Sequence, residues 1–226
     1  MVFLPAICKY RRFCVRSGFA RMMWTTITAI RLRTTTRLSS DRLEYTLGNA
    51  YRVFGAPPGE ISAVYGNLFA AEAEDGLCEL SFRDLEAAQT FSRWSLRQSQ
   101  WFVSDDDRFF MQALADLLRF AIRTGAITKD DLLLTEPSVL AKLTADPVCA
   151  RYWAQYRRIT GTCAGKTPPD NTYAVRVRAK KRHINPLVQT HSGMKRQTEL
   201  DEGFAAQLRA FLQDDFDRFV WASFAD

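Results

Sequence analysis

The stretch that most constrains the fold is 39–54, SSDRLEYTLGNAYRVF. It opens with two serines and an aspartate, whose short side-chain oxygens can accept hydrogen bonds from the unpaired amides of a first helical turn. Apolar residues then recur at three- and four-residue steps, at Leu43, Leu47, Ala50, Val53 and Phe54. Such spacing places them on one side of a helix. The stretch therefore predicts an amphipathic helix with one buried face.

Three polar residues lie close together at the start of this helix. Asp41, Arg42 and Tyr45 are neighbours there, because positions three or four apart adjoin on a helical surface. A carboxylate can bind a metal ion, and a guanidinium and a phenol can bind phosphate. The trio can therefore hold a cation and an anion together. A capped amphipathic helix with a surface ion pair explains the same residues without any ligand.

The segment DRLEYTLGNAYR resembles the last conserved segment of the HD-domain metal-dependent phosphohydrolases. The resemblance implies that Asp41 is the final ligand of a metal site, and that Arg42 and Tyr45 contact phosphate. Asn49 stands where many relatives have a sugar-contacting aspartate, and this departure weakens the case for a nucleotide substrate. Further likeness to the helical region after the HD core lies in 109–127, in DDLLLTEPSVLAKL and in AKKRHINPLV. Together these segments extend the resemblance to the C-terminus.

The other metal ligands of that family do not precede Asp41. The family uses two further histidines and an aspartate, whereas no His, Asp or Glu comes before Asp41 here. The two histidines, His183 and His191, lie far downstream. A single carboxylate cannot hold a catalytic transition metal. The resemblance implies a divalent metal and a phosphate-containing small-molecule substrate for the parent family, but we expect this chain neither to bind the metal nor to be active alone.

Composition narrows the class of protein. A length of 226 residues with 47% hydrophobic residues suits a globular protein with a sizeable core. No apolar run reaches the length of a membrane span, so we expect no membrane association. The five cysteines are scattered, without a C-x-x-C pair. This pattern argues against a zinc knuckle or a disulfide framework and favours a cytoplasmic location.

The net charge of +6 arises from the basic residues of one segment. Residues 1–38 contain eight Lys or Arg side chains and no acidic residue, so the rest of the chain is close to neutral. That distribution makes nucleic acid an unfavoured partner. Three interpretations of 1–38 stay open: an organellar presequence, a basic arm, or a stretch read in the wrong frame. Under the third, a frame shifted by one base over 22–38 can encode acidic, histidine-containing sequence similar to what relatives carry at this point. The chain would then be a truncated record of an HD protein.

The remainder predicts a series of helices. Ser81 is a candidate cap for a helix that begins FRDLEAAQTFSRW, and Ser104 for a helix that Gly125 ends. Further helix starts are predicted at Thr128, Glu136 and Asp146, and at Thr198 for the last helix. The helix after Asp146 is rich in Tyr, Trp and Arg. Aromatic residues at helical spacing are typical of a core, although this composition can also stack on bases.

Irregular and extended structure is predicted between the last two of these helices. GTCAGKTPPDN is predicted to be a loop, and Tyr173–Val177 a half-buried strand that continues to Pro186. His183 is then a surface or strand-end residue. Gly161 and Gly165, the two glycines before Lys166, are one residue too close together for a phosphate-binding P-loop, and two prolines follow Thr167.

We therefore predict a mainly α protein: an HD-superfamily-like helical bundle remnant at 39–226 with a small β element near 173–196, preceded by a basic segment at 1–38. The predicted function is that of an HD phosphohydrolase-like protein that is inactive as this chain. The first alternative is a non-catalytic helical interaction module, and a less favoured one is a basic-armed nucleic-acid binder.

Overall fold

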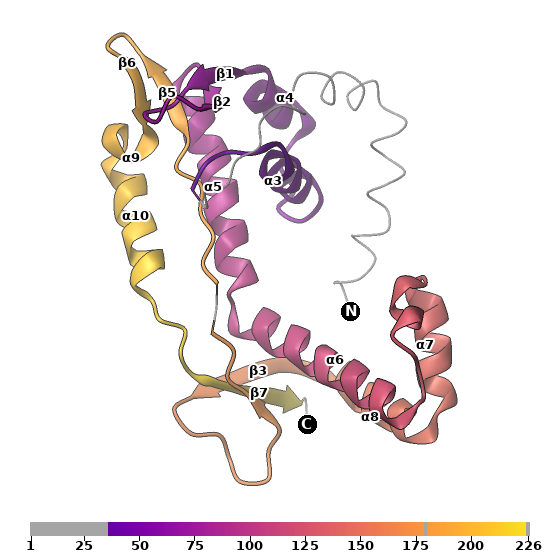
Figure 1. Cartoon of the computed structure of the whole chain (residues 1–226). Helices are drawn as coiled ribbons and strands as arrows, with labels where there is room; N and C mark the ends of the chain where they lie inside the picture. The colour runs from indigo at the N-terminus through magenta and orange to yellow at the C-terminus, as the bar shows by residue number, and fades with distance from the viewer. Residues whose placement is uncertain (1–35, 179, 225–226) are drawn as a thin grey trace. The chain divides into compact units, whose positions relative to one another are not determined.

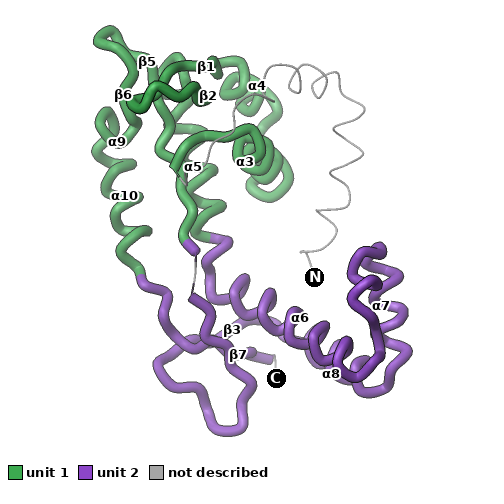
Figure 2. Tube along the Cα trace, in the orientation of Figure 1, with its two compact units in different colours: residues 1–100, 181–214 green, residues 101–180, 215–226 purple. Residues whose placement is uncertain are grey.

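The structure is a computed structural model and describes residues 36–178 and 180–224. Helices account for most of its regular structure, so the prediction of a mainly α protein is confirmed. The chain divides into two compact units (Figure 2). Unit 1 contains the described residues up to Gln100 together with Lys181–Asp214, and unit 2 contains Trp101–Lys180 and the chain from Asp215 onward. The range 39–226, predicted as one domain, is thus shared between both units. Within the described ranges, every helix is too short or too polar to pass through a lipid bilayer.

Unit 1 combines helices with a four-stranded sheet (Figure 1). Its elements are α3 (Ser40–Arg52), α4 (Pro58–Gly66), β1 (Leu68–Glu72), β2 (Cys78–Phe82), α5 (Leu85–Phe102), β5 (Leu187–Thr190), β6 (Gly193–Arg196), α9 (Gln197–Leu200) and α10 (Glu202–Gln213). The last two residues of α5 belong to unit 2. The strand order is β1-β2-β5-β6; β2 and β5 are parallel, and the other neighbours are antiparallel.

The core of unit 1 is built around the buried face of α3. The predicted buried face of α3 is confirmed at Leu43, which is 1% exposed, and at Leu47 and Ala50. It was wrong at Val53, which follows the last helical residue and is 42% exposed. Leu38, just before the helix, is fully buried in the same cluster. Phe82 on β2 and Phe91 on α5 lie in this cluster with ring centroids 5.4 Å apart. Burial of this apolar surface, worth roughly 25 cal/mol per Å², holds the helices against the sheet.

The start of α5 differs from the sequence-based prediction. Ser81, predicted to cap this helix, lies in β2 and pairs with Phe69 on β1. Strand pairing extends the backbone there, so the helix begins only after the strand ends. The cap is Asp84, whose Oδ1 accepts a hydrogen bond from the amide of Ala87 at 2.9 Å. A turn at Asp75-Gly76 joins β1 to β2, and Gly76 has a φ of 76°.

Unit 2 packs helices with a three-stranded antiparallel sheet in the order β3-β7-β4. Its elements are α6 (Asp105–Thr124), the 3₁₀ helix η1 (Asp130–Leu133), α7 (Glu136–Ala145), α8 (Pro147–Arg157), β3 (Ile159–Gly165), β4 (Ala174–Val175) and β7 (Phe219–Phe224). The helix starts predicted for this region are confirmed. The Ser104 hydroxyl accepts from the amide of Asp107, Gly125 ends α6 with a φ of 80°, and Asp146 caps α8.

The β structure is more extensive than the predicted element near 173–196. The prediction of a loop over GTCAGKTPPDN was wrong in its first half, because β3 pairs with β7 from Ile159↔Phe224 to Gly165↔Phe219. The predicted strand at 173–177 is reduced to β4, and it does not continue to Pro186. The strands within 173–196 also belong to two different sheets, since β4 lies in unit 2 and β5 and β6 in unit 1.

Candidate functional site

The start of α3 presents the predicted acid and phenol at the surface of unit 1. Asp41 is exposed, and Tyr45 is 61% exposed. The hydroxyl of Ser39 donates a hydrogen bond to the Asp41 carboxylate and does not cap the helical backbone. That bond fixes the carboxylate at the first turn of the helix. Asn49 lies two turns further along and is partly buried.

Arg42 is held against a segment that is remote in sequence. Its Nη1 donates a hydrogen bond to the backbone carbonyl of His183 at 3.1 Å. Burial lowers the pKa of Arg42, the neighbouring carboxylate of Asp41 opposes that shift, and nearby Arg182 adds to it. The guanidinium nevertheless stays charged at neutral pH, because the pKa of arginine is so high. The result is a fixed positive group beside an exposed phenol.

His183 completes this environment and was not expected in it. The sequence pattern predicted a surface or strand-end position for His183, whereas the residue is partly buried in the extended chain before β5. Its Nδ1 is buried and has no hydrogen-bond partner among the described residues. Burial lowers the pKa of His183, and the charge of Arg42 lowers it further. The imidazole is therefore neutral at pH 7.

The described residues do not fit a metal ion at this site. Across 36–178 and 180–224, no group of three or more His, Cys, Asp or Glu side chains lies close enough to bind one. Asp41 is engaged by the Ser39 hydroxyl and adjoins the positive Arg42. A catalytic metal site needs about three protein ligands, and a neighbouring guanidinium opposes a bound cation.

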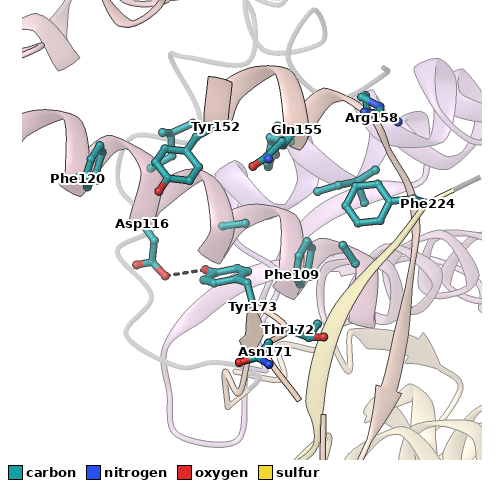
Figure 3. A pocket seen from close by; sticks show the side chains of 15 residues that line it. Phe109, Asp116, Phe120, Tyr152, Gln155, Arg158, Asn171, Thr172, Tyr173 and Phe224 are labelled. Carbon is teal, nitrogen blue, oxygen red and sulfur yellow. Dashed lines mark hydrogen bonds between the residues drawn. The ribbon is translucent and has the colours of Figure 1, made fainter. Parts of the chain in front are cut away.

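Unit 2 contains a different feature, a cavity of about 710 Å³ between α6, α8 and β7 (Figure 3). Six of its fifteen lining residues are aromatic. Tyr152 and Tyr156, predicted as core residues, both line it, as does Tyr173. The alternation of Tyr, Trp and Arg in α8 was the sequence signal for this surface. No sequence pattern indicated that Phe224 and Phe109 would line the same cavity, because that depends on the pairing of β3 with β7.

No family model, curated protein or solved structure matches this chain. The resemblance to HD-domain phosphohydrolases stays a prediction from the sequence; of the four segments that carry it, DRLEYTLGNAYR contains Asp41 and AKKRHINPLV contains His183. In unit 1, those two segments are adjacent, joined by the bond from Arg42 to His183.

The lowered pKa of His183 predicts a pH-dependent loss of stability. Because the folded state takes up a proton less readily than the unfolded state, stability falls as the pH drops below about 6.5, the ordinary pKa of histidine. We expect the urea midpoint of the wild-type chain to fall more between pH 7.5 and 5 than that of His183→Gln. His191→Gln, which removes the other, exposed histidine, should follow the wild type. Parallel decreases in the wild type and His183→Gln would contradict this explanation.

Proposed function

We propose that this chain is a relative of the HD-domain phosphohydrolases, that the start of α3 binds a phosphate group of a small molecule, and that the chain does not hydrolyse it alone. The observation that carries the proposal is the fixed position of Arg42. Its guanidinium is hydrogen-bonded to the His183 carbonyl and lies beside the exposed Tyr45. A positioned guanidinium is the side chain best suited to phosphate oxygens.

Electrostatics supports an anion here but limits its affinity. The first turn of a helix carries a partial positive charge, and Arg182 adds a second cation near Arg42. Asp41 acts in the opposite direction, because its negative charge adjoins the same position. We therefore expect weak binding, with a dissociation constant in the millimolar range.

The described residues support binding but not a hydrolytic step. In the parent family a metal supplies an activated water and Lewis acidity. Because the residues around Asp41 do not fit a metal, we assign them only to contact and orient the ligand. Arg42 would pair with phosphate oxygens, and Tyr45 would donate a hydrogen bond to one of them.

Calorimetric titration with tripolyphosphate tests the proposal. We expect Arg42→Gln to weaken binding roughly tenfold, since a charge-assisted hydrogen bond contributes about 1.5–3 kcal/mol. Arg93→Gln is the matched control, because Arg93 is exposed on α5 and its guanidinium donates a hydrogen bond to Thr90 within the same helix. We also expect no phosphate release above the blank when Mn²⁺ is added.

Two outcomes would contradict the proposal: equal affinity of Arg42→Gln and the wild type, or no saturable binding of tripolyphosphate. The second would favour the alternative of a non-catalytic interaction module. One observation in unit 2 suits that alternative: three consecutive leucines at η1 and just after it are exposed, Leu133 by 86%. Exposed apolar patches are typical of protein-binding surfaces.

A further inference from the structure

The cavity in unit 2 has the size and lining of a small-molecule site. Its volume of about 710 Å³ lies within the range of roughly 300–1,000 Å³ that is usual for ligand pockets. Six aromatic side chains from two helices, a loop and a strand line it: Phe109, Phe120, Tyr152, Tyr156, Tyr173 and Phe224. Three of these are 45–54% exposed, namely Tyr152, Tyr173 and Phe224. So much accessible aromatic surface around one hollow favours a flat ring as the ligand.

The rings are held in position on the side of the cavity formed by α6. Phe120 and Tyr152 meet edge to face, with centroids 5.5 Å apart, and Phe109 and Tyr173 do so at 5.9 Å. The Tyr173 hydroxyl donates a hydrogen bond to Asp116 at 2.7 Å, as Figure 3 shows. Preorganised walls lower the entropic cost of binding.

The charge of Asp116 is already compensated. Its other carboxylate oxygen accepts hydrogen bonds from Gln112 and Arg119, each at 2.9 Å. Burial, and then the bond to Asp116, raises the pKa of Tyr173, so its hydroxyl stays protonated. This side of the cavity therefore presents neutral aromatic surface rather than a free negative charge.

Arg158 lies elsewhere on the cavity wall, at the C-terminal end of α8. It is exposed, and its guanidinium has no acidic partner among the described residues. Gln155, one turn earlier, adds a carboxamide to the same wall. Because the negative charge of Asp116 is compensated by its partners and the positive charge of Arg158 is not, the net charge facing the cavity is positive. An anionic group on the ligand would complement it.

We propose that this cavity binds a planar aromatic molecule that carries one anionic group, with the ring against Tyr152 and Tyr173 and the anionic group paired with Arg158. The carboxylates and phosphates of aromatic compounds share this chemistry. The site lies wholly within unit 2 and does not depend on the phosphate site proposed in unit 1.

Calorimetry on the full chain with three probes tests the ligand class. Naphthoate and naphthyl phosphate carry an anionic group, and naphthamide is the neutral counterpart of naphthoate. We expect naphthoate to bind roughly fivefold more tightly than naphthamide, the size of effect that a solvent-exposed ion pair gives. The relative affinities of naphthoate and naphthyl phosphate, measured on Arg42→Gln so that the phosphate site proposed in unit 1 does not contribute, then indicate which anionic group the cavity prefers.

Two variants with matched controls locate the site. Tyr152→Ala should weaken naphthoate binding roughly tenfold, because stacking on one aromatic side chain contributes about 1–3 kcal/mol. Tyr51→Ala removes an equally exposed tyrosine from α3 and should have no effect. Arg158→Gln should abolish the preference for naphthoate over naphthamide, and Arg157→Gln, which removes the adjacent exposed charge, should retain it. Far-UV circular dichroism checks that each variant is folded.

Three results would overturn the proposal. These are the absence of saturable naphthoate binding, unchanged binding in a folded Tyr152→Ala variant, and naphthamide binding at least as tight as naphthoate binding. Arg42→Gln should leave naphthoate binding unchanged, so failure of the unit 1 phosphate site and failure of this site give different results.

Discussion

Replacing Glu79 with alanine is expected to lower the free energy of opening the unit 1 sheet by roughly 3–5 kcal/mol. Glu79 lies on β2 and is completely buried between two arginines. Its Oε1 is 2.6 Å from Nη1 of Arg196, and its Oε2 is 3.2 Å from Nε of Arg37. Both arginine side chains are themselves nearly buried, at 15% and 8% exposed. Without this carboxylate, the two desolvated cations would face each other and keep only the more exposed carboxylates of Glu74 and Asp75 as partners.

Glu74 provides the matched control for Glu79. It pairs with the same Arg196, at 2.7 Å, but its side chain is 60% exposed. Solvent screens such a pair, so Glu74→Gln should cost at most about 1 kcal/mol. Hydrogen exchange of the β2 and β6 amides measures the opening of this sheet without requiring the whole chain to unfold in one step. Equal protection of these amides in Glu79→Ala and Glu74→Gln would show that the buried carboxylate has no special role.

Helix boundaries were predictable wherever the deciding chemistry is local. Ser104 and Gly125 define α6, and Asp146 begins α8, because a cap depends only on the three or four residues beside it. Ser81 shows the limit of this reasoning. It has the side chain of a cap, but the pairing of β2 with β1 and β5 determines its conformation. A cap motif cannot reveal that a strand competes for the same residue.

The strands were less predictable because their partners are distant in sequence. In β3, the pairing of Gly165 with Phe219 joins residues more than fifty positions apart. The β3 sequence, ITGTCAG, is rich in glycine and small residues, and by itself it favours a loop. Pairing with β7, which is richer in aromatic residues, supplies the stabilisation that local propensity lacks.

The same distinction applies to the candidate sites. The proximity of Tyr45 to Asp41 and Arg42 follows from helical spacing, so the sequence could predict it. The contact of Arg42 with His183 spans 141 residues, and no spacing rule connects them. For the unit 2 cavity, the aromatic character of α8 was visible in the sequence. The exposure of these aromatic side chains to a cavity was not visible, because it depends on how β7 and the loop at Tyr173 pack against α6 and α8.

Replacing Arg108 with methionine should have a similarly large effect on unit 2. We expect it to lower the free energy of separating β7 from its partner strands by roughly 2–5 kcal/mol, because two carbonyl oxygens would lose a buried charged donor. Arg108 is 5% exposed on α6. Its Nη1 donates to the carbonyls of Val177, at 2.8 Å, and Phe216, at 2.7 Å. It therefore joins α6 to the chain after β4 and to the chain before β7.

The backbone conformation of Phe216 increases the expected effect of losing the bond from Arg108 to its carbonyl. Phe216 has a φ of 50°, a conformation that costs a non-glycine residue about 1–3 kcal/mol and persists only when its surroundings enforce it. The Phe216 carbonyl accepts bonds from Arg108 and from the amide of Arg218, the latter at 3.0 Å. We expect loss of the Arg108 bond to release the backbone just before β7 and to increase hydrogen exchange of the Phe219–Phe224 amides. Arg119→Gln is the control on the same helix, since Arg119 is 62% exposed in its pair with Asp116 and should contribute at most about 1 kcal/mol. Unchanged protection of β7 in Arg108→Met would mean that the pairing of β7 with β3 and β4 holds Phe216 in this conformation without the arginine.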